Sequence, residues 1–559
     1  MKKIFLYSIS ALMSASLAVS CLGDLDTMPL DQTVYTADKA FADPSSYSQY
    51  ANYAYSYFSL VSQGDPGSSD IAVSDAGQSE FTRQYMVLNE MSTDALKCVW
   101  GDSYVPEIGY NRWNASNTAV LAVYLRGLKG VAICNQFLDE SVSGDASVTG
   151  RGHESVLNDV RGFRAELRLL RAVYYSMLLD LFGNPPVVLP EHIGSSEFPT
   201  QMSTDFAEGR RLLFEWIETE LKECIADDNL PAVRKSYPRL SKGAAWAVLA
   251  RMYLNAEVYT GTAHWQDAMT AADHVINEGG YQLCPSYDNL FLQDNTTNGA
   301  QNEFIIAAMY DCEATQSWGG TTHLVYSPAH ADIRMDISQT LGYSSDIYKN
   351  QWNGYHCSEA FIDENFALTN VEKGAFKYNG DKRAKLYYFD NPFTNDVTDI
   401  TSGYTCLKWL PLTSTGEPLL VNKDIEQSSA DFPFYRLAEM YLIYAEAEAR
   451  ANGGMLPASG KGAQLLLALG QRANGASYTL PANIDTEWIL KERVRELMWE
   501  GHRRTDLIRY GKFTSAQYGW PYKAGIADGR AAIDSYRTVY PIISTDLIAN
   551  PNLVQNPGY

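Results

Sequence analysis

One long amphipathic helix is the feature that most constrains the fold. The segment 160–190, VRGFRAELRLLRAVYYSMLLDLFGNPPVVLP, carries apolar side chains at steps of three and four, namely Phe163, Leu167, Leu170, Tyr174, Leu178 and Leu181. This spacing makes one continuous apolar stripe along a helix of about six turns. Gly183 can adopt a left-handed C-cap, and Pro185 and Pro186 prevent the helix from continuing. We therefore expect a structural helix that ends at Gly183.

The same segment carries a second stripe of basic residues, Arg161, Arg164, Arg168 and Arg171. Such a stripe could bind an anion. The chain also contains 66 acidic side chains, and these are simpler partners for the arginines. We therefore expect the arginines to pair with acidic neighbours.

Further helical patterns recur along the chain, over 204–225, 241–259, 265–281, 434–453, 462–475 and 486–511. A Gly-Thr turn separates 241–259 from 265–281, and small alanines would let this pair approach closely. Tetratricopeptide-type helical hairpins need such close approach. The irregular spacing predicts diverged helical repeats with large insertions.

The remaining sequence differs in composition. Residues 42–118 and 285–431 are rich in Gly, Ser, Thr, Asn, Asp and Tyr and have no long helical period. The sequence thus predicts a mainly α protein, with a helical-repeat scaffold over about 119–284 and 432–512, loop-rich insertions and a few short strands. We expect residues 41–559 to form a single composite domain. Binding groups are most often found on long irregular segments of this kind.

The N-terminus has the pattern of a secretory signal, with two lysines followed by a short apolar run. Cys21 follows small residues, as in bacterial lipoproteins, although Ala18 replaces the usual leucine. We expect a signal peptide over 1–20, a lipid on Cys21 and a tether over 21–40. An ordinary signal peptide with a coincidental cysteine is the alternative. Since no other stretch approaches about 18 apolar residues, we expect attachment through lipid alone.

Charge and motifs exclude several functions. The net charge of −22 disfavours binding to nucleic acid or to anionic lipid surfaces. The other seven cysteines have no CxxC spacing, which predicts buried free thiols in place of disulfides or zinc ligands. The sequence contains no phosphate-binding loop, GxSxG or HExxH motif. Enzymatic activity is not supported.

The irregular segments place aromatic rings beside polar groups, in DAGQSEFTR (75–83), TDALKCVWGDS (93–103), QSWGG (316–320) and QWNGYHC (351–357). Sugars present an apolar face to flat aromatic rings and a rim of hydroxyls to polar side chains. The composition therefore allows a carbohydrate platform. For any single tryptophan, core packing is the alternative.

Six ordered motifs carry a resemblance to a known family: CLGDLDTMPLDQ, FRAELRLLRAVYYSMLLDLFGNPPVV, RLSKGAAWAVLARMYLNAEVYTG, YDNLFLQDN with NEFII, FPFYRLAEMYLIYAEA and RELMWEGHRRTDLIRYGKF. With these motifs the chain resembles the SusD/RagB group of outer-membrane glycan-binding lipoproteins over nearly its whole length. It is especially similar to the starch-binding founder member of that group.

This resemblance implies tetratricopeptide-like helix pairs and an irregular ligand-binding half. It implies a non-catalytic, lipid-anchored protein at the cell surface that delivers an oligosaccharide or polysaccharide to a SusC-like TonB-dependent β-barrel transporter. No cofactor is required for that role.

The resemblance also implies binding residues. Asp75 and Arg83 match polar sugar-contacting positions, and Trp100 matches a tryptophan of the aromatic arc. Asp102 or Ser103 takes the place of an asparagine contact, because one residue is deleted here.

Two further arc positions lie in the second irregular segment. Trp318 matches an arc tyrosine, and the last arc position falls on Trp352 or Tyr355, because the loop 326–352 is longer than in the founder.

A structural calcium ion is a further expectation from the resemblance. Asp294 and Asp431 match the founder's calcium site, although Thr296 replaces an acid.

Several alternatives stay open at this point. The same fold could bind another cargo, such as a peptide or a host glycoprotein glycan, or the chain could be a secreted glycoside hydrolase or a scaffold for protein partners. The glycan could be starch, fructan, xyloglucan, mannan, a pectic chain or a host glycan. The stoichiometry with the transporter is also open.

Overall fold

The computed structural model describes residues 37–559 apart from 63, 65, 66, 74, 142–144, 194, 196, 342–346, 394–398 and 419–425. The expected signal peptide, Cys21 and most of the expected tether lie outside the described residues. The described part is mainly helical with a few short strands, which confirms the predicted fold class.

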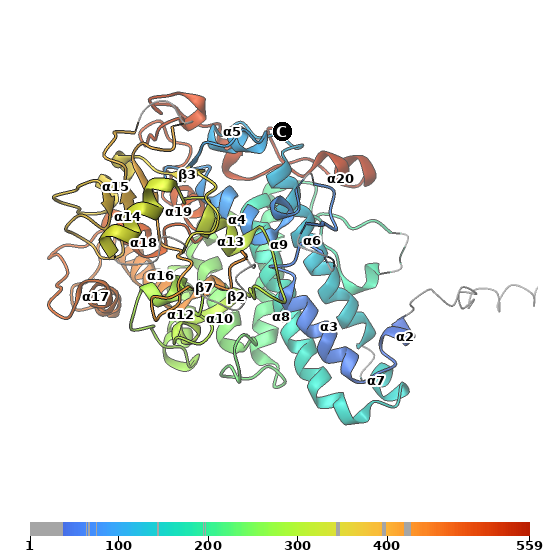
Figure 1. Ribbon diagram of the computed structural model, residues 1–559. Coiled ribbons are helices and arrows are strands. Elements are labelled where there is room, and N and C mark those ends of the chain that lie inside the picture. The colour runs from blue at the N-terminus through green and yellow to red at the C-terminus, as the bar shows by residue number, and fades with distance from the viewer. Residues whose placement is uncertain are drawn as a thin grey trace, which may run out of the picture.

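A series of helices forms the scaffold, and each packs against the next, in the order α6 (Thr118–Glu140), α8 (Leu157–Phe182), α9 (Phe206–Ala226), α10 (Lys242–Leu254), α12 (Trp265–Glu278), α16 (Leu437–Ala451) and α17 (Lys461–Asn474). Figure 1 shows α6, α8 and α3 side by side in one half of the molecule, with the loop-rich segments gathered in the other half. This is the arrangement of helical repeats that the sequence predicts.

The other α-helices are short or medium in length: α2 (Ala37–Ala40), α3 (Ser45–Ser56), α4 (Phe81–Glu90), α5 (Tyr104–Gly109), α7 (Ala146–Gly150), α11 (Ala256–Thr260), α13 (Gly320–Tyr326), α14 (Ala331–Leu341), α15 (Glu359–Asn365), α18 (Thr486–Leu497), α19 (Arg503–Arg509) and α20 (Ser544–Ala549). Short 3-10 helices are η1 (Gly77–Ser79), η2 (Glu154–Val156), η3 (Pro190–His192), η4 (Asp288–Phe291), η5 (Ala300–Asn302), η6 (Lys523–Gly525) and η7 (Ser535–Thr538).

The strands pair antiparallel in small sheets. One pair joins β1 (Lys97–Cys98) to β3 (Tyr355–His356), and another joins β2 (Phe304–Ala308) to β7 (Phe432–Arg436). The third sheet has the order β4 (Gly374–Ala375), β5 (Leu386–Tyr388) and β6 (Tyr404–Cys406). The β1–β3 pair joins two segments that are far apart in the sequence, and both belong to the candidate site.

The long helix predicted at 160–182 is confirmed as α8. Gly183 ends the helix, as predicted, and its N–H donates a hydrogen bond to the carbonyl of Leu179. Its φ of +73° is positive, but its ψ of −60° lies outside the left-handed helical conformation that was expected. The predicted acidic partners are present for most of its arginines: Arg161 pairs with Asp145, and Arg168 and Arg171 pair with Glu220.

Arg164 departs from that prediction. Its guanidinium donates to the backbone carbonyl of Ser141, because no carboxylate lies within ion-pair distance among the described residues. Partial burial lowers the pKa of Arg164.

The secondary structure differs from the sequence-based expectation in three places. Residues 432–436 form β7, because pairing with β2 places them in a buried ladder before α16 begins. The segment 241–259 is divided at Asn255 into α10 and α11. The segment 42–118 was expected to be irregular, yet it contains α3, α4 and α5.

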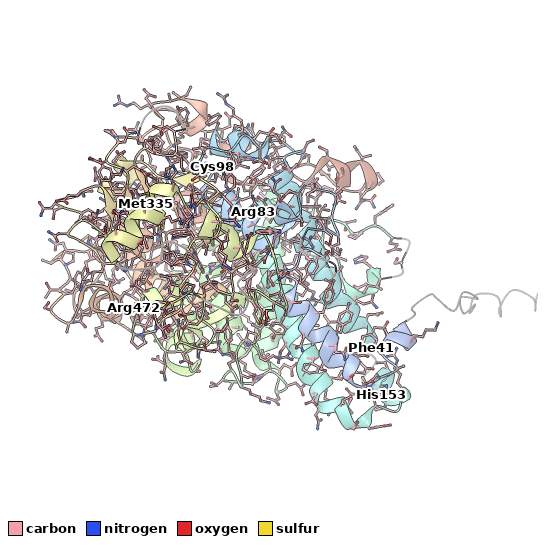
Figure 2. The ribbon with its side chains drawn as sticks, viewed as in Figure 1. Phe41, Arg83, Cys98, His153, Met335 and Arg472 are labelled. Atoms are coloured by element: carbon pink, nitrogen blue, oxygen red, sulfur yellow. The ribbon has the colours of Figure 1, made fainter. Side chains whose placement is uncertain are left out.

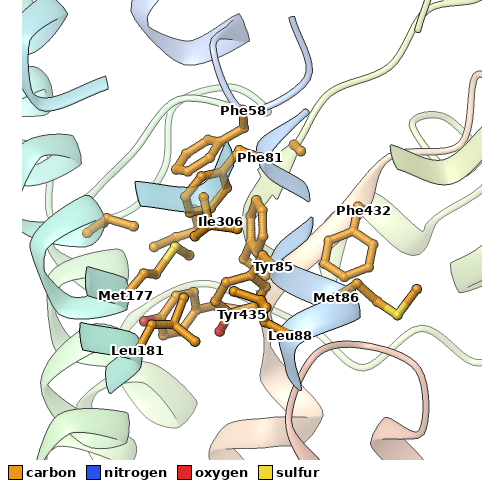
Figure 3. Packing of buried hydrophobic residues seen from close by; sticks show 14 of the residues in the cluster. Phe58, Phe81, Tyr85, Met86, Leu88, Met177, Leu181, Ile306, Phe432 and Tyr435 are labelled. Carbon is orange, nitrogen blue, oxygen red and sulfur yellow. The ribbon is translucent and has the colours of Figure 1, made fainter. Parts of the chain in front are cut away.

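All ten residues of helix α4 are buried, including polar ones such as Thr82 and Gln84, so the helix has no solvent face. Its apolar residues Phe81, Tyr85 and Leu88 have helical spacing, but over two turns only. It lies where the two halves of the molecule meet. Figure 3 shows Phe81, Tyr85 and Leu88 of α4 packing toward Met177 and Leu181 of α8 and Tyr435 of β7, while Phe432 lies on the opposite side of α4, beside Met86. A rigid α4 therefore positions the loop that precedes it.

Two further expectations concern α6 and the cysteines. Among the described residues, α6 is long and apolar enough to span a membrane, contrary to the expectation of no such stretch; most of it is buried against neighbouring helices. The seven cysteines after Cys21 are buried free thiols, as predicted.

Candidate functional site

Six of the seven predicted binding residues line one open cleft of about 660 Å³. They come from four segments of the chain, 75–83, 93–103, 316–320 and 351–357, and the β1–β3 pair joins the second of these to the fourth. Three residues that the sequence reasoning missed line the same cleft. The described residues that line it are Asp75, Gln78, Arg83, Trp100, Asp102, Trp318, Asn350, Trp352 and Glu426.

The first wall of the cleft is the turn before α4. The Asp75 carboxylate accepts from the backbone N–H of Gln78 at 2.8 Å, and the Gln78 side-chain amide donates to Asp102 at 3.0 Å. The buried guanidinium of Arg126 holds this turn in place, since it donates hydrogen bonds to the carbonyls of Ser79 and Val61 at 2.7 and 2.5 Å. Asp75, Gln78 and Asp102, together with Arg83 described next, form the polar edge of the cleft.

Arg83 is the cation of this edge. It is only 6% exposed, and its guanidinium lies 3.9 Å from the Asp75 carboxylate and 5.8 Å from the centre of the Trp100 ring. It also donates to the Tyr104 hydroxyl at 3.4 Å, while its Nε has no partner within the described residues. Figure 2 labels Arg83 near the centre of the molecule, between the helical half and the loop-rich half.

The Trp100 indole is held in place from several sides. Its Nε1–H donates to the carbonyl of Trp352 at 3.0 Å, and its ring lies 5.3 Å from the ring of Tyr355 at an interplanar angle of 34°. Gly354 leaves room for the ring, because a Cβ there would lie 2.3 Å from the indole. The ring is therefore fixed before any ligand binds.

Three tryptophans form a row along the cleft. The ring centres of Trp318 and Trp352 are 6.4 Å apart, and those of Trp352 and Trp100 are 6.3 Å apart. All three rings are partly exposed. A row of flat apolar faces beside a polar edge can stack against successive rings of a sugar chain.

The choice between Trp352 and Tyr355 is decided by burial. Tyr355 is completely buried beneath Trp100, and its hydroxyl hydrogen-bonds to Nε2 of His323 at 2.6 Å. The expectation that Tyr355 could face a ligand is therefore wrong, and Trp352 occupies that place in the cleft.

The turn that carries Trp318 rests on Glu80. The buried Glu80 carboxyl accepts hydrogen bonds from the hydroxyls of Ser317 and Tyr310, and burial raises its pKa to about 7. Gly319 follows Trp318 directly, and a Cβ there would meet the Glu80 carboxyl. Glu80 and the glycine together fix the direction of the Trp318 backbone.

Asp102 lines the cleft, whereas Ser103 is the N-cap residue of α5. Of the missed residues, Gln78 lies inside the motif DAGQSEFTR and could have been proposed as a hydrogen-bonding neighbour. Asn350 and Glu426 give no signal in the sequence, because only the fold brings their segments together.

Asp294 and Asp431, the two carboxylates expected to bind calcium, are both hydrogen-bonded within the protein. The Asp431 carboxylate accepts from the Tyr237 hydroxyl and from the backbone N–H of Tyr310 at 2.8 Å, while Asp294 accepts from Ser414 and Asn298. The two carboxylates therefore have separate partners. In the described ranges no group of three or more His, Cys, Asp or Glu residues is arranged to hold a metal.

Comparison with known proteins identifies the family. The sequence profile of the SusD family matches residues 247–559. The starch-binding protein SusD of Bacteroides thetaiotaomicron is 30% identical to this chain over an alignment 600 residues long, which covers 100% of this chain and 99% of that protein. The chain belongs to the SusD family.

Solved structures of the SusD superfamily share its fold. A laminarin-binding SusD-like protein superposes with a TM-score of 0.65 at 20% identity, covering 92% of this chain and 99% of the other. Surface glycan-binding protein A of Bacteroides thetaiotaomicron, solved with laminarihexaose, gives a TM-score of 0.63 at 17% identity, covering 91% and 98%. At these identities the likeness concerns the fold.

Proposed function

We propose that this protein is a non-catalytic glycan-binding lipoprotein of the cell surface, and that the cleft of Trp100, Trp318 and Trp352 holds an oligosaccharide or polysaccharide. The observation that carries the proposal is the row of three partly exposed tryptophan rings beside the polar edge of Asp75, Arg83 and Asp102. Membership of the SusD family supports it, because SusD itself is a starch-binding protein.

Delivery to a transporter and attachment to the outer membrane are part of the same proposal. A lipid on Cys21 would anchor the chain, and a SusC-like TonB-dependent β-barrel would receive the glycan. A pull-down of the full chain with the transporter from the same membrane tests this step. Recovery of no β-barrel partner from detergent extracts would contradict it.

Native affinity electrophoresis tests glycan binding. The soluble form without residues 1–21 should be retarded by at least one polysaccharide in a panel of starch, laminarin, inulin, xyloglucan and galactomannan. Trp100→Ala should abolish the retardation, because stacking on an aromatic ring is worth on the order of 1 kcal/mol or more. Trp246→Ala is the matched control: Trp246, in α10, is also partly buried, but it stacks on His274 of α12, outside the cleft.

Unchanged migration of the Trp100→Ala variant would remove the assignment of the site. Purified protein should release no reducing ends from the retarding polysaccharide, whereas release would favour a glycoside hydrolase. Retardation by no polysaccharide would favour a peptide cargo or a scaffold role.

A further inference from the structure

A second polar group lies at the Trp352 end of the cleft. The Asn350 side-chain amide donates to the Glu426 carboxylate at 2.6 Å, and both residues line the cleft. Both are only partly buried, so the second oxygen of the carboxylate can accept a further hydrogen bond. Neither residue belongs to the polar edge formed by Asp75, Gln78, Arg83 and Asp102.

The Glu426 backbone is fixed against the row of tryptophans. The Tyr326 hydroxyl donates to the carbonyl of Glu426 at 2.8 Å, and the Tyr326 ring lies 5.8 Å from that of Trp352. The backbone N–H of Trp352 in turn donates to the carbonyl of Tyr326 at 3.0 Å. Contacts thus run from Arg83 through Trp100 and Trp352 to Tyr326 and Glu426, with one polar group at each end.

The charges of the lining are unequal. Among the described residues of the lining, three carboxylates, Asp75, Asp102 and Glu426, face one cation, Arg83. That guanidinium is almost fully buried and already lies beside Asp75. A glycan with a carboxylate or sulfate on each residue would therefore meet a net negative lining, and the net charge of −22 on the whole chain adds to the repulsion.

We propose that Asn350 and Glu426 form a second subsite for sugar hydroxyls, and that Glu426 with Asp75 and Asp102 restricts the cleft to uncharged glycans. This inference rests on the proposed glycan binding. A carboxylate accepts hydrogen bonds from adjacent hydroxyls, and such charge-assisted bonds are stronger than neutral ones. The same carboxylate repels a polyuronate, so one side chain contributes both affinity and selectivity.

The test compares neutral polysaccharides with polygalacturonate in native affinity electrophoresis. The soluble wild type should be retarded by a neutral polysaccharide of the panel and not by polygalacturonate. Glu426→Ala should weaken retention on that neutral polysaccharide by about tenfold, the loss of one charge-assisted hydrogen bond. Glu426→Gln should lose less, because the amide oxygen still accepts a hydrogen bond.

Glu417→Ala is the matched control, since Glu417 is an exposed glutamate of the same chain segment outside the cleft. Asn350→Ala removes the amide donor without changing charge, and should weaken neutral binding if the pair acts as one subsite. The variant Asp75→Asn, Asp102→Asn, Glu426→Gln should gain retention on polygalacturonate. Thermal unfolding of each variant separates lost binding from lost folding.

Neutral binding that is unchanged in both Glu426→Ala and Asn350→Ala would overturn the second subsite. Retention of the wild type by polygalacturonate, or failure of the triple variant to gain it, would overturn the charge selection. If the wild type is retarded by none of the polysaccharides, the proposed function itself is wrong and this inference falls with it.

Discussion

Replacing Gly354 with alanine tests whether the position of the Trp100 ring determines binding. The φ angle of Gly354 lies outside the left-handed region, so an alanine backbone is compatible with this conformation. The added methyl group is therefore the only perturbation, and it points at the indole.

The structure gives the size of the effect. A Cβ at residue 354 would lie 2.3 Å from Cε2 and 2.4 Å from Cζ2 of Trp100, whereas carbon atoms in contact lie about 3.5–4.0 Å apart. The backbone cannot retreat, because the Gly354 N–H donates to the carbonyl of Ser327 at 2.7 Å and its carbonyl accepts from Val99 at 3.0 Å. The indole must move by about 1 Å, away from its hydrogen bond to Trp352.

We expect Gly354→Ala to cost about 1–3 kcal/mol of folding stability through overpacking. We expect it to weaken glycan binding about fivefold or more, the loss of roughly 1 kcal/mol of stacking. Urea unfolding measures the first quantity, and isothermal titration with the retarding glycan measures the second.

Gly101→Ala is the matched control. Gly101 follows Trp100 in the chain, and a Cβ there meets no atom within 4 Å. Its stability and affinity should stay at the wild-type values. Wild-type affinity in a folded Gly354→Ala variant would refute the idea that a fixed Trp100 ring is part of the binding surface.

Three further predictions concern residues outside the row of tryptophans. Burial raises the pKa of Glu80 from 4.5 to about 7, so protonation of this carboxyl stabilises the fold below about pH 4.5, and the contribution is lost as pH rises through 7. The free energy of unfolding of Glu80→Gln, measured in urea, should therefore rise by about 3 kcal/mol relative to that of the wild type between pH 4.5 and pH 8. A difference that does not depend on pH would contradict this. Arg436→Met removes the arginine that pairs with the buried carboxylates of Glu303, Glu496 and Glu500, and it should lower the free energy of unfolding by about 3–5 kcal/mol in the same assay. A loss below about 1 kcal/mol would argue against the importance of these ion pairs. Cys21→Ser should incorporate no labelled fatty acid and should be lost from the outer-membrane fraction; continued labelling would move the anchor to another residue.

The helical scaffold could be predicted from the sequence because its helices have one apolar and one polar face. Helix α8 shows a period of three and four residues and a glycine C-cap, and both are local signals. Helix α4 has only a two-turn apolar stripe of Phe81, Tyr85 and Leu88 and no exposed polar face, because all of its residues are buried. Strand β7 was assigned to a helix because its pairing with β2 depends on a segment more than a hundred residues away.

The cleft could be predicted only in part. Asp75, Arg83, Trp100, Asp102, Trp318 and Trp352 could be proposed because aromatic and polar residues recur in short motifs that match the family. Tyr355 lies in the same motif as Trp352, and only the β1–β3 register shows that it is buried beneath Trp100. Glu426 joins the site through a hydrogen bond to Asn350, which no local pattern can indicate.

A crystal structure of residues 22–559 with an oligosaccharide from the retarding polysaccharide tests the central claim most directly. We predict sugar rings stacked on Trp100, Trp318 and Trp352, with hydroxyls within hydrogen-bond distance of Arg83 or Asp102. Sugar bound elsewhere, such as in the groove of about 640 Å³ lined by Leu456, Leu467 and Tyr478, with the cleft empty, would contradict the assignment.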